Sequence, residues 1–181
     1  MESKGVLKLK DFYVTSDTWF GREQILQIAN RKDFKDIKDM NNSLIKLWNK
    51  TVKKDDVVFH LGNFAWDPHT AETMLRKLNG KIYFLLGPSD EALLDVYEEF
   101  KNAVILEDQI LTLPMHDVVL CHYPLRDWGG KESGTLHIHG HSLFNNLTDL
   151  ASERRVNVCT DHWGFKPIKI STLKDFINEE I

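Results

Sequence analysis

Short apolar runs rich in β-branched and aromatic residues recur along the chain, and each is followed by a polar, turn-like segment. The runs cover residues 12–14, 57–59, 82–86, 118–120 and 136–139, and the segments after them read TSDTWFGR, HLGNFAWDP, GPSD, CHYPLRDW and GHSLF. Runs of this length bounded by Gly, Pro, Asn or Asp are typical of β-strands. The pattern therefore predicts five strands, each with a polar loop at its carboxyl end.

Between the early strands, apolar residues recur at intervals of three and four, which is the spacing of an amphipathic helix. This spacing predicts helices over residues 23–30, 40–51, 68–78 and 91–100, and a last one over 173–180. Ser89 is expected to cap the helix over 91–100, and Ser171 or Thr172 the last helix.

Strands that alternate with helices early in the chain predict βαβ units and a largely parallel sheet. After Val104 the strands follow one another closely, as in a sheet continued by hairpins. No linker or repeat divides the chain, so we expect a single α/β domain over residues 1–181, built as two packed layers or as a sandwich flanked by helices. Because ligands gather at the carboxyl ends of strands in such sheets, the five loops are expected to meet at one rim.

The composition is that of an ordinary globular protein, with 42% hydrophobic and 28% charged residues. A net charge of −4 argues against a dedicated nucleic-acid surface, because binding to phosphate backbones needs clustered Lys and Arg. No apolar stretch approaches the roughly 20 residues of a membrane helix, so no membrane contact is expected. Cys121 and Cys159 lie in apolar runs and indicate buried free thiols in a reducing compartment, which predicts a cytoplasmic protein.

Each polar loop by itself fits a structural role as well as a chemical one. A lone aspartate after a strand is often a turn former, and His122 could be a core histidine satisfied by the backbone. His137, His139 and His141 occupy alternate positions, which indicates a metal site, although an edge strand with polar side chains has the same pattern. We interpret His60, His137 and His139 as structural or as residues that support the site from behind its ligands, rather than as ligands themselves.

The five loops are more specific together than apart. The blocks SDTW, LGNF, GPSD, CHYP and GHSL stand in this order at the predicted strand ends. With flanks such as VVLCHYPLRDW, they resemble the calcineurin-like metallophosphoesterase superfamily, in particular its small bacterial and phage-type members, whose blocks read D-x-H, G-D, G-N-H-D, H and G-H-x-H. The resemblance spans nearly the whole chain and implies a four-layer α/β/β/α sandwich of two mixed sheets flanked by helices.

Members of that family are metal-dependent phosphoesterases in which two divalent cations clamp a phosphoryl group and generate a hydroxide nucleophile. Several positions that the resemblance assigns to this centre differ here. Trp19 and Leu143 replace ligand histidines, and Asn63 replaces the bridging aspartate. Pro88 and Ser89 replace an asparagine ligand and the catalytic histidine. A neutral amide holds two adjacent dications far less well than a carboxylate, so two-metal hydrolysis is not expected and no residue is expected to be catalytic.

Asp17, His122 and His141 match ligand positions of the family. The two histidines and Asn63 could still hold one divalent cation of the Zn, Mn or Fe type. The expected cofactor is therefore one such metal at a weak site, or none.

We expect a protein that binds a phosphorylated small molecule or nucleotide in the former active-site cleft without hydrolysing it. The expected ligand-binding residues are Asp17, Trp19, Arg22, Asn63, Ser89, His122, Arg126 and His141. Arg22 could replace lost metal charge with a guanidinium, the helix start at Ser89 could receive a phosphate, and Trp19 is either an apolar plug or a platform for a nucleobase. Two alternatives remain: a residual phosphodiesterase or phosphatase that uses one cation, and a scaffold that binds a protein partner.

Overall fold

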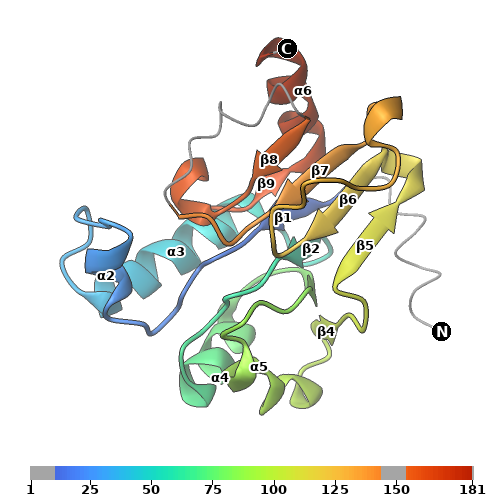
Figure 1. Ribbon diagram of the computed structural model, residues 1–181. Coiled ribbons are helices and arrows are strands. Elements are labelled where there is room, and N and C mark those ends of the chain that lie inside the picture. The colour runs from blue at the N-terminus through green and yellow to red at the C-terminus, as the bar shows by residue number, and fades with distance from the viewer. Residues whose placement is uncertain (1–10, 144–153, 181) are drawn as a thin grey trace.

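The computed structural model describes residues 11–143 and 154–180 of the chain (Figure 1). A five-stranded sheet has the order β4-β3-β2-β1-β9. Strands β1, β2, β3 and β4 run parallel to one another, and β9 pairs antiparallel with β1. The strands of this sheet are β1 (Tyr13–Thr15), β2 (Val57–His60), β3 (Lys81–Phe84), β4 (Ala103–Ile105) and β9 (Ile168–Lys169). The expected parallel sheet is confirmed.

A second sheet has the order β5-β6-β7-β8. Its strands are β5 (Ile110–Leu113), β6 (Val118–Cys121), β7 (Leu136–His139) and β8 (Arg155–Asn157). The expectation of a sheet continued by hairpins is right only for β5 and β6, which pair antiparallel. Strands β6, β7 and β8 are parallel, because residues 122–135 cross from the end of β6 back to the start of β7.

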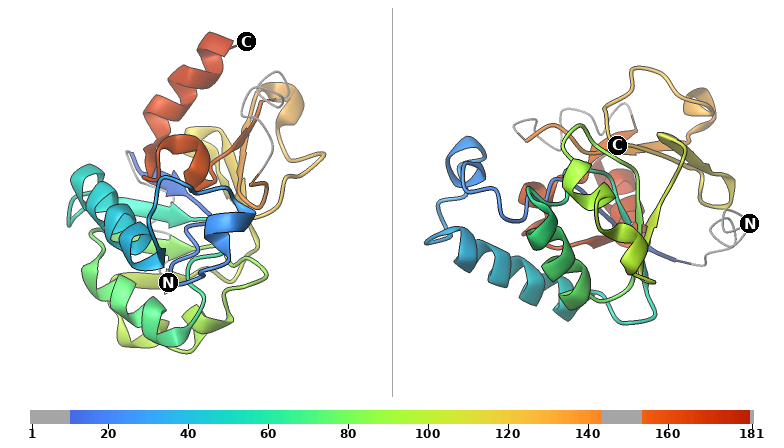
Figure 2. Two further views of the ribbon diagram at one scale, coloured as in Figure 1. Left: turned by 90° about the vertical axis from the view of Figure 1, so that its left-hand side faces the viewer. Right: turned by 90° about the horizontal axis from the view of Figure 1, so that it is seen from below.

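The helices cover mainly the five-stranded sheet. They are α2 (Ile25–Ile28), α3 (Ile37–Thr51), α4 (Pro68–Lys77), α5 (Glu91–Leu94) and α6 (Ile170–Glu180), with 3-10 turns at Tyr97–Glu99, Pro114–His116, Lys131–Ser133 and Thr160–Trp163. Helices α3 and α4 begin where Asp36 and Asp67 accept a hydrogen bond from the backbone N–H three residues later, which is the usual N-cap arrangement. Figure 2 shows α3 and α4 next to each other on one side of the molecule.

The helices differ in places from their expected bounds: α2 is shorter than the expected 23–30, and α3 begins before residue 40. The helix expected over 91–100 is the four-residue α5 followed by a 3-10 turn. Its N-cap is Asp90 and not Ser89, and the Asp90 carboxylate accepts hydrogen bonds from backbone N–H groups outside the helix instead of capping it. So short a helix lacks the aligned dipole that the expected phosphate site at Ser89 requires. The last helix begins at Ile170, before the expected caps Ser171 and Thr172.

Alternation along the strands of the first sheet creates two apolar cores. Val58 and Ile82 point toward the helices and pack in a cluster with Trp48 and Leu75. The next residue of each strand, such as Phe59 after Val58, points the other way, into a cluster with apolar residues of β6, β7 and α6. The five-stranded sheet is therefore buried on both faces, which suits its nearly continuous apolar strands.

The described residues thus form a mixed α/β fold with two mixed sheets flanked by helices (Figures 1 and 2). Within residues 11–143 and 154–180, the helices are all too short or too polar to cross a membrane.

Arg31 joins three separate segments beneath the ends of the strands. Its side chain is completely buried, and its guanidinium donates to both carboxylate oxygens of Asp161 at 2.8 and 2.7 Å. It also donates to the backbone carbonyls of Asp17 and Thr18, each at 2.8–2.9 Å. Because Asp161 is only 13% exposed, this pair is poorly screened by water.

We expect Arg31→Met to lower the free energy of unfolding by about 3 kcal/mol, because it leaves the Asp161 carboxylate and two carbonyls without their donors. Chemical denaturation at pH 7 measures the loss. The matched control is Arg76→Met, which removes the exposed pair with Glu72 and should cost less than about 1 kcal/mol. Equal losses of unfolding free energy in the two variants would show that the buried pair stabilises the fold no more than the exposed pair does.

Candidate functional site

The loops after β1, β2, β3, β6 and β7 meet at one end of the two sheets. The backbone N–H of Asp17 donates to the Gly62 carbonyl at 3.0 Å, which joins the first two loops. The Gly140 N–H donates to the His122 carbonyl at 3.0 Å, which joins the last two. The expected convergence of the five loops therefore exists in the structure, and it spans both sheets.

Two glycines make this convergence possible. A Cβ on Gly62, whose φ is +91°, would lie 2.5 Å from the backbone nitrogen of Gly87 and 2.6 Å from Nδ1 of His122. A Cβ on Gly140 would lie 2.4 Å from the hydroxyl oxygen of Ser16. Separations this short leave no room for a side chain. Only glycine therefore fits at these two positions, because the loops approach each other so closely.

The Asp17 carboxylate lies at the middle of the centre and accepts three hydrogen bonds. Its Oδ1 accepts from Nδ2 of Asn63 at 2.8 Å. Its Oδ2 accepts from the Ser16 hydroxyl and from the backbone N–H of His141, both at 2.8 Å. Asp17 is 1% exposed, and three donors take the place of water around its charge.

His122 has one ring nitrogen fixed by the backbone and one directed at the centre. Its Nδ1 lies 2.5 Å from the Leu61 carbonyl, which can only accept, so Nδ1 carries the proton. Nε2 is then the ring nitrogen that faces the centre. Nδ1 of His141 lies 3.2 Å from this atom and Nδ2 of Asn63 lies 3.4 Å from it. Asp17, Asn63, His122 and His141 therefore form one continuous polar cluster, which we call the central network.

Asp90 anchors the network from below. Its carboxylate accepts from the backbone N–H groups of Asn63, Phe64 and Gly87 at 2.7–2.8 Å. Burial raises the pKa of Asp90, while the three N–H donors act in the opposite direction. Sequence reasoning did not include this residue in the site, although it is the surviving aspartate of the GPSD block.

Four residues of the centre have a left-handed backbone. The φ angles are 56° at Asp17, 53° at Trp19, 59° at Asn63 and 68° at His141. Asp and Asn adopt this region more readily than other residues with a side chain, whereas a tryptophan there is strained. The surrounding hydrogen bonds and packing must hold Trp19 in place.

Trp19 lies in the core between the first sheet and the helices, and only 6% of it is exposed. Leu143 packs against the same core. Of the two interpretations of Trp19, an apolar plug or a platform for a nucleobase, this placement corresponds to the plug. The Arg22 guanidinium carbon lies 4.2 Å from the centre of the Trp19 ring and 4.8 Å from that of Trp66, which is 49% exposed.

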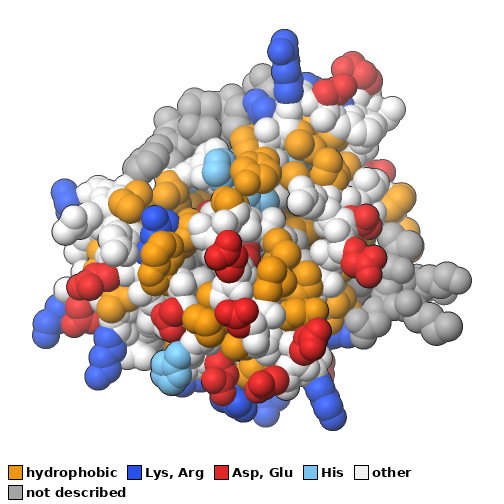
Figure 3. All heavy atoms as spheres, turned by 60° about the horizontal axis from the view of Figure 1, so that its bottom comes forward, with side chains coloured by type: hydrophobic (Ala, Val, Ile, Leu, Met, Phe, Trp, Pro, Cys, Tyr) orange, Lys and Arg blue, Asp and Glu red, His pale blue; other side chains and the backbone are white. Residues whose placement is uncertain are grey.

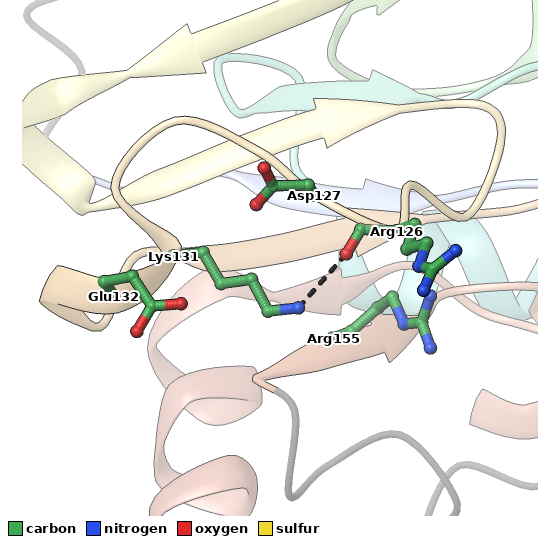
Figure 4. Close-up of a pocket in the computed structure, with 5 residues that line it drawn as sticks. All are labelled: Arg126, Asp127, Lys131, Glu132 and Arg155. Atoms are coloured by element: carbon green, nitrogen blue, oxygen red, sulfur yellow. Dashed lines mark hydrogen bonds between the residues drawn. The ribbon is translucent and has the colours of Figure 1, made fainter.

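The remaining two expected site residues lie farther out. Ser89 lines a hollow of about 390 Å³ with Trp66, Pro68, Pro88, Glu91, Ala92 and Asp95. Figure 3 shows acidic side chains set between hydrophobic ones on the face of the molecule that includes α4 and α5. Arg126 does not line this hollow or bond to the central network but lines a different hollow beside β8 (Figure 4). The expectation that Arg126 shares the rim is therefore not met, because residues 122–135 turn back toward the start of β7.

The donor atoms can be compared with what a metal requires. In the part of the chain that the structure describes, no three His, Cys, Asp or Glu side chains form a group suited to a metal. The 3.2 Å between Nε2 of His122 and Nδ1 of His141 matches the separation of about 3.3 Å that two imidazoles have on a tetrahedral ion. Asn63 does not complete this set, because its bond to Asp17 turns the amide N–H toward His122. Two of the three expected ligands fit a cation in this arrangement.

Comparisons with known proteins give relatives that match over nearly the whole of both chains. No family model matches the chain. An uncharacterized protein of Methanocaldococcus jannaschii is 26% identical over 180 residues, which cover 96% of this chain and 94% of the relative. The gene 66 protein of Mycobacterium phage L5 is 22% identical over 205 residues and covers 94% and 95% of the two chains. The crystal structure of a protein of unknown function from Aquifex aeolicus has a TM-score of 0.70 at 22% identity, over 92% of this chain and 98% of that one, and thus shows the same fold.

Three buried histidines surround the centre without joining the central network. Burial lowers the pKa of His60 to about 3, that of His137 to about 4 and that of His139 to about 3. His60 accepts from or donates to the Thr18 hydroxyl at 3.0 Å and contacts the rings of Phe64 and Phe84. All three rings are neutral in the folded protein at neutral pH.

We expect the free energy of unfolding to fall as the pH drops from about 6.5 to about 4. In this window the unfolded chain protonates the three histidines and the folded protein does not, so acid favours the unfolded state. Each histidine contributes up to about 1.4 kcal/mol per pH unit. His60→Phe should reduce this acid sensitivity by roughly one histidine's share, since Thr18 keeps its bond to the Phe64 carbonyl. Denaturant titrations at several pH values measure the slope, and an unchanged slope in His60→Phe would contradict the assignment.

Proposed function

We propose that the chain is a protein with the metallophosphoesterase-like four-layer α/β/β/α sandwich that binds a phosphorylated small molecule or nucleotide beside its former active-site cleft and does not hydrolyse it. The order of the five sequence blocks and the meeting of their loops support the fold assignment. The proposed location is the cytoplasm, which the free, buried thiols of Cys121 and Cys159 support.

The state of Asn63 supports the absence of two-metal hydrolysis. Where the resemblance puts a carboxylate shared by two cations, the Asn63 amide donates to the Asp17 carboxylate. The negative charge of Asp17 is therefore already satisfied by N–H and O–H donors of the protein. A cation pair around a reactive hydroxide would need these bonds to break and a second negative ligand to replace the amide.

The single observation that carries ligand binding is the environment of Arg22. Its guanidinium lies over two indole rings, and its Nε is buried without a hydrogen-bond acceptor among the described residues. Contact with two aromatic faces fixes the plane of the guanidinium, so that its N–H groups point within that plane and can meet a negatively charged group. A phosphate oxygen supplies the acceptor that this arginine lacks.

The hollow beside Trp66 can receive the rest of the ligand. Its volume of about 390 Å³ lies within the usual range of small-molecule sites. The half-exposed Trp66 ring offers a stacking face. Glu91 and Asp95 line the same hollow and can accept hydrogen bonds from sugar hydroxyls, but they repel a phosphate, so the phosphate belongs at the Arg22 side.

A thermal-shift screen of nucleotides and sugar phosphates tests ligand binding. We expect at least one compound at about 100 times its Kd to raise the Tm by several degrees, which corresponds to about 2.7 kcal/mol. Arg22→Gln should abolish the shift, because the amide carries no charge for the phosphate, and Arg22→Lys should retain only part of it.

Arg76→Gln is the matched control, since Arg76 is exposed and pairs with Glu72 on α4. Its ligand response should equal that of the wild type. A panel without any stabilising phosphate compound, or an Arg22→Gln variant that responds like the wild type, would overturn the binding proposal.

Hydrolysis of bis(p-nitrophenyl) phosphate with Mn²⁺ should stay at background in the wild type and in Asn63→Asp. The variant restores the acidic bridge, but Trp19, Ser89 and Leu143 still stand where the resemblance places two ligands and the proton donor. Release of p-nitrophenol measures the rate. Metal-dependent turnover that His122→Ala abolishes would contradict the proposal.

That outcome would instead favour the second candidate, a phosphodiesterase that uses one cation. The observation behind it is the 3.2 Å separation of the His122 and His141 ring nitrogens. A cation held there would act as a Lewis acid on a phosphoryl oxygen. Elemental analysis separates the candidates, because this second one requires close to one metal per chain that is lost in both His122→Ala and His141→Ala.

A further inference from the structure

A second hollow, of about 670 Å³, lies beside the four-stranded sheet and shares no lining residue with the central network (Figure 4). Its walls come from the segment 122–135 and from the start of β8. The lining residues are Arg126, Asp127, Lys131, Glu132 and Arg155. Three cationic and two anionic side chains thus line one hollow on a chain whose net charge is −4.

The charges are unevenly arranged around this hollow. Figure 4 shows the guanidinium groups of Arg126 and Arg155 next to each other at one end. In the same view Asp127 points away from that pair, and the Glu132 carboxylate lies at the other end of the hollow, beyond Lys131. Two neighbouring guanidinium groups can both donate hydrogen bonds to one anion placed between them. The basic end of the hollow is therefore the end that suits an anion.

The basic side chains are attached to a well-bonded frame. Arg155 donates through Nη1 to the Leu125 carbonyl at 3.0 Å, which ties β8 to the segment after β6. Lys131 donates to the Arg126 carbonyl at 3.1 Å, and its ammonium lies 4.8 Å from the centre of the Trp128 ring. The Trp128 indole is itself 92% buried by contact with the sheet. Arg155 and Lys131 are thus ordered before binding and lose little entropy when a ligand arrives.

We propose that this hollow binds a compact phosphate group, free or as the phosphomonoester of a small molecule, between the guanidinium groups of Arg126 and Arg155, with Lys131 as a third cation nearby. The planar forks of two arginines match the oxygens of a single phosphate. Asp127 and Glu132 beyond the basic end disfavour an extended polyanion, such as a nucleic-acid strand, because its further phosphates would meet carboxylates. This site is independent of the one around Arg22.

Isothermal titration calorimetry of the Arg22→Gln protein tests this proposal without interference from the first site. Inorganic phosphate and glycerol 3-phosphate are titrated separately, and we expect at least one to bind. The source with the higher affinity identifies the ligand class as free phosphate or phosphomonoester. Adding Arg126→Gln should weaken binding about tenfold or more, since one of the two charged forks is lost.

Arg126 is exposed and its bond in this frame is made by its backbone carbonyl, so Arg126→Gln should leave the melting temperature unchanged. Asp127→Asn with Glu132→Gln should tighten binding several-fold by removing the neighbouring negative charge. Arg76→Gln again serves as the control for a lost surface charge. Absence of binding by both probes, or equal affinity with and without Arg126→Gln, would overturn the proposal and leave the one for Arg22 intact.

Discussion

The hydrogen bond from the Asn63 amide to the Asp17 carboxylate is the interaction on which the arrangement of the centre depends. It fixes the orientation of the amide, and this orientation decides that His122 faces an N–H group rather than an oxygen. The Asn63 backbone is held in turn by Asp90, so two buried carboxylates are connected through one residue. Both carboxylates are surrounded by N–H and O–H donors of the protein, which offset the cost of burying them.

Much of the fold could be predicted because the sequence pattern reflects it directly. The apolar runs before the polar loops are strands, and the spacing of three and four residues marks α3 and α4. The parallel order of β6, β7 and β8 could not be predicted, because the 122–135 segment that allows it has no helical spacing to announce a crossover. The helix over 91–100 was predicted too long, because the Asp90 carboxylate bonds to N–H groups of the loop after β2 and of its own loop instead of capping the helix.

The candidate site, too, could be predicted from the sequence only in part. Asp17, Asn63, His122 and His141 follow strand ends, and the carboxyl ends of parallel strands bring such residues together. The contact of Arg22 with Trp66 depends on how two irregular loops lie across each other, which no spacing encodes. The pair of Arg31 with Asp161 joins residues 130 positions apart and has no local signal at either end.

The left-handed backbone at Asp17, Trp19, Asn63 and His141 has a consequence for redesign of this protein. Backbone hydrogen bonds and glycines bend the loops toward one another. New ligand side chains introduced at residues 19, 63, 89 and 143 would therefore be displayed on a framework that already converges. Building a metal centre there becomes a question of side-chain chemistry, and replacing Trp19 by a residue that tolerates a positive φ would relax the main chain in the process.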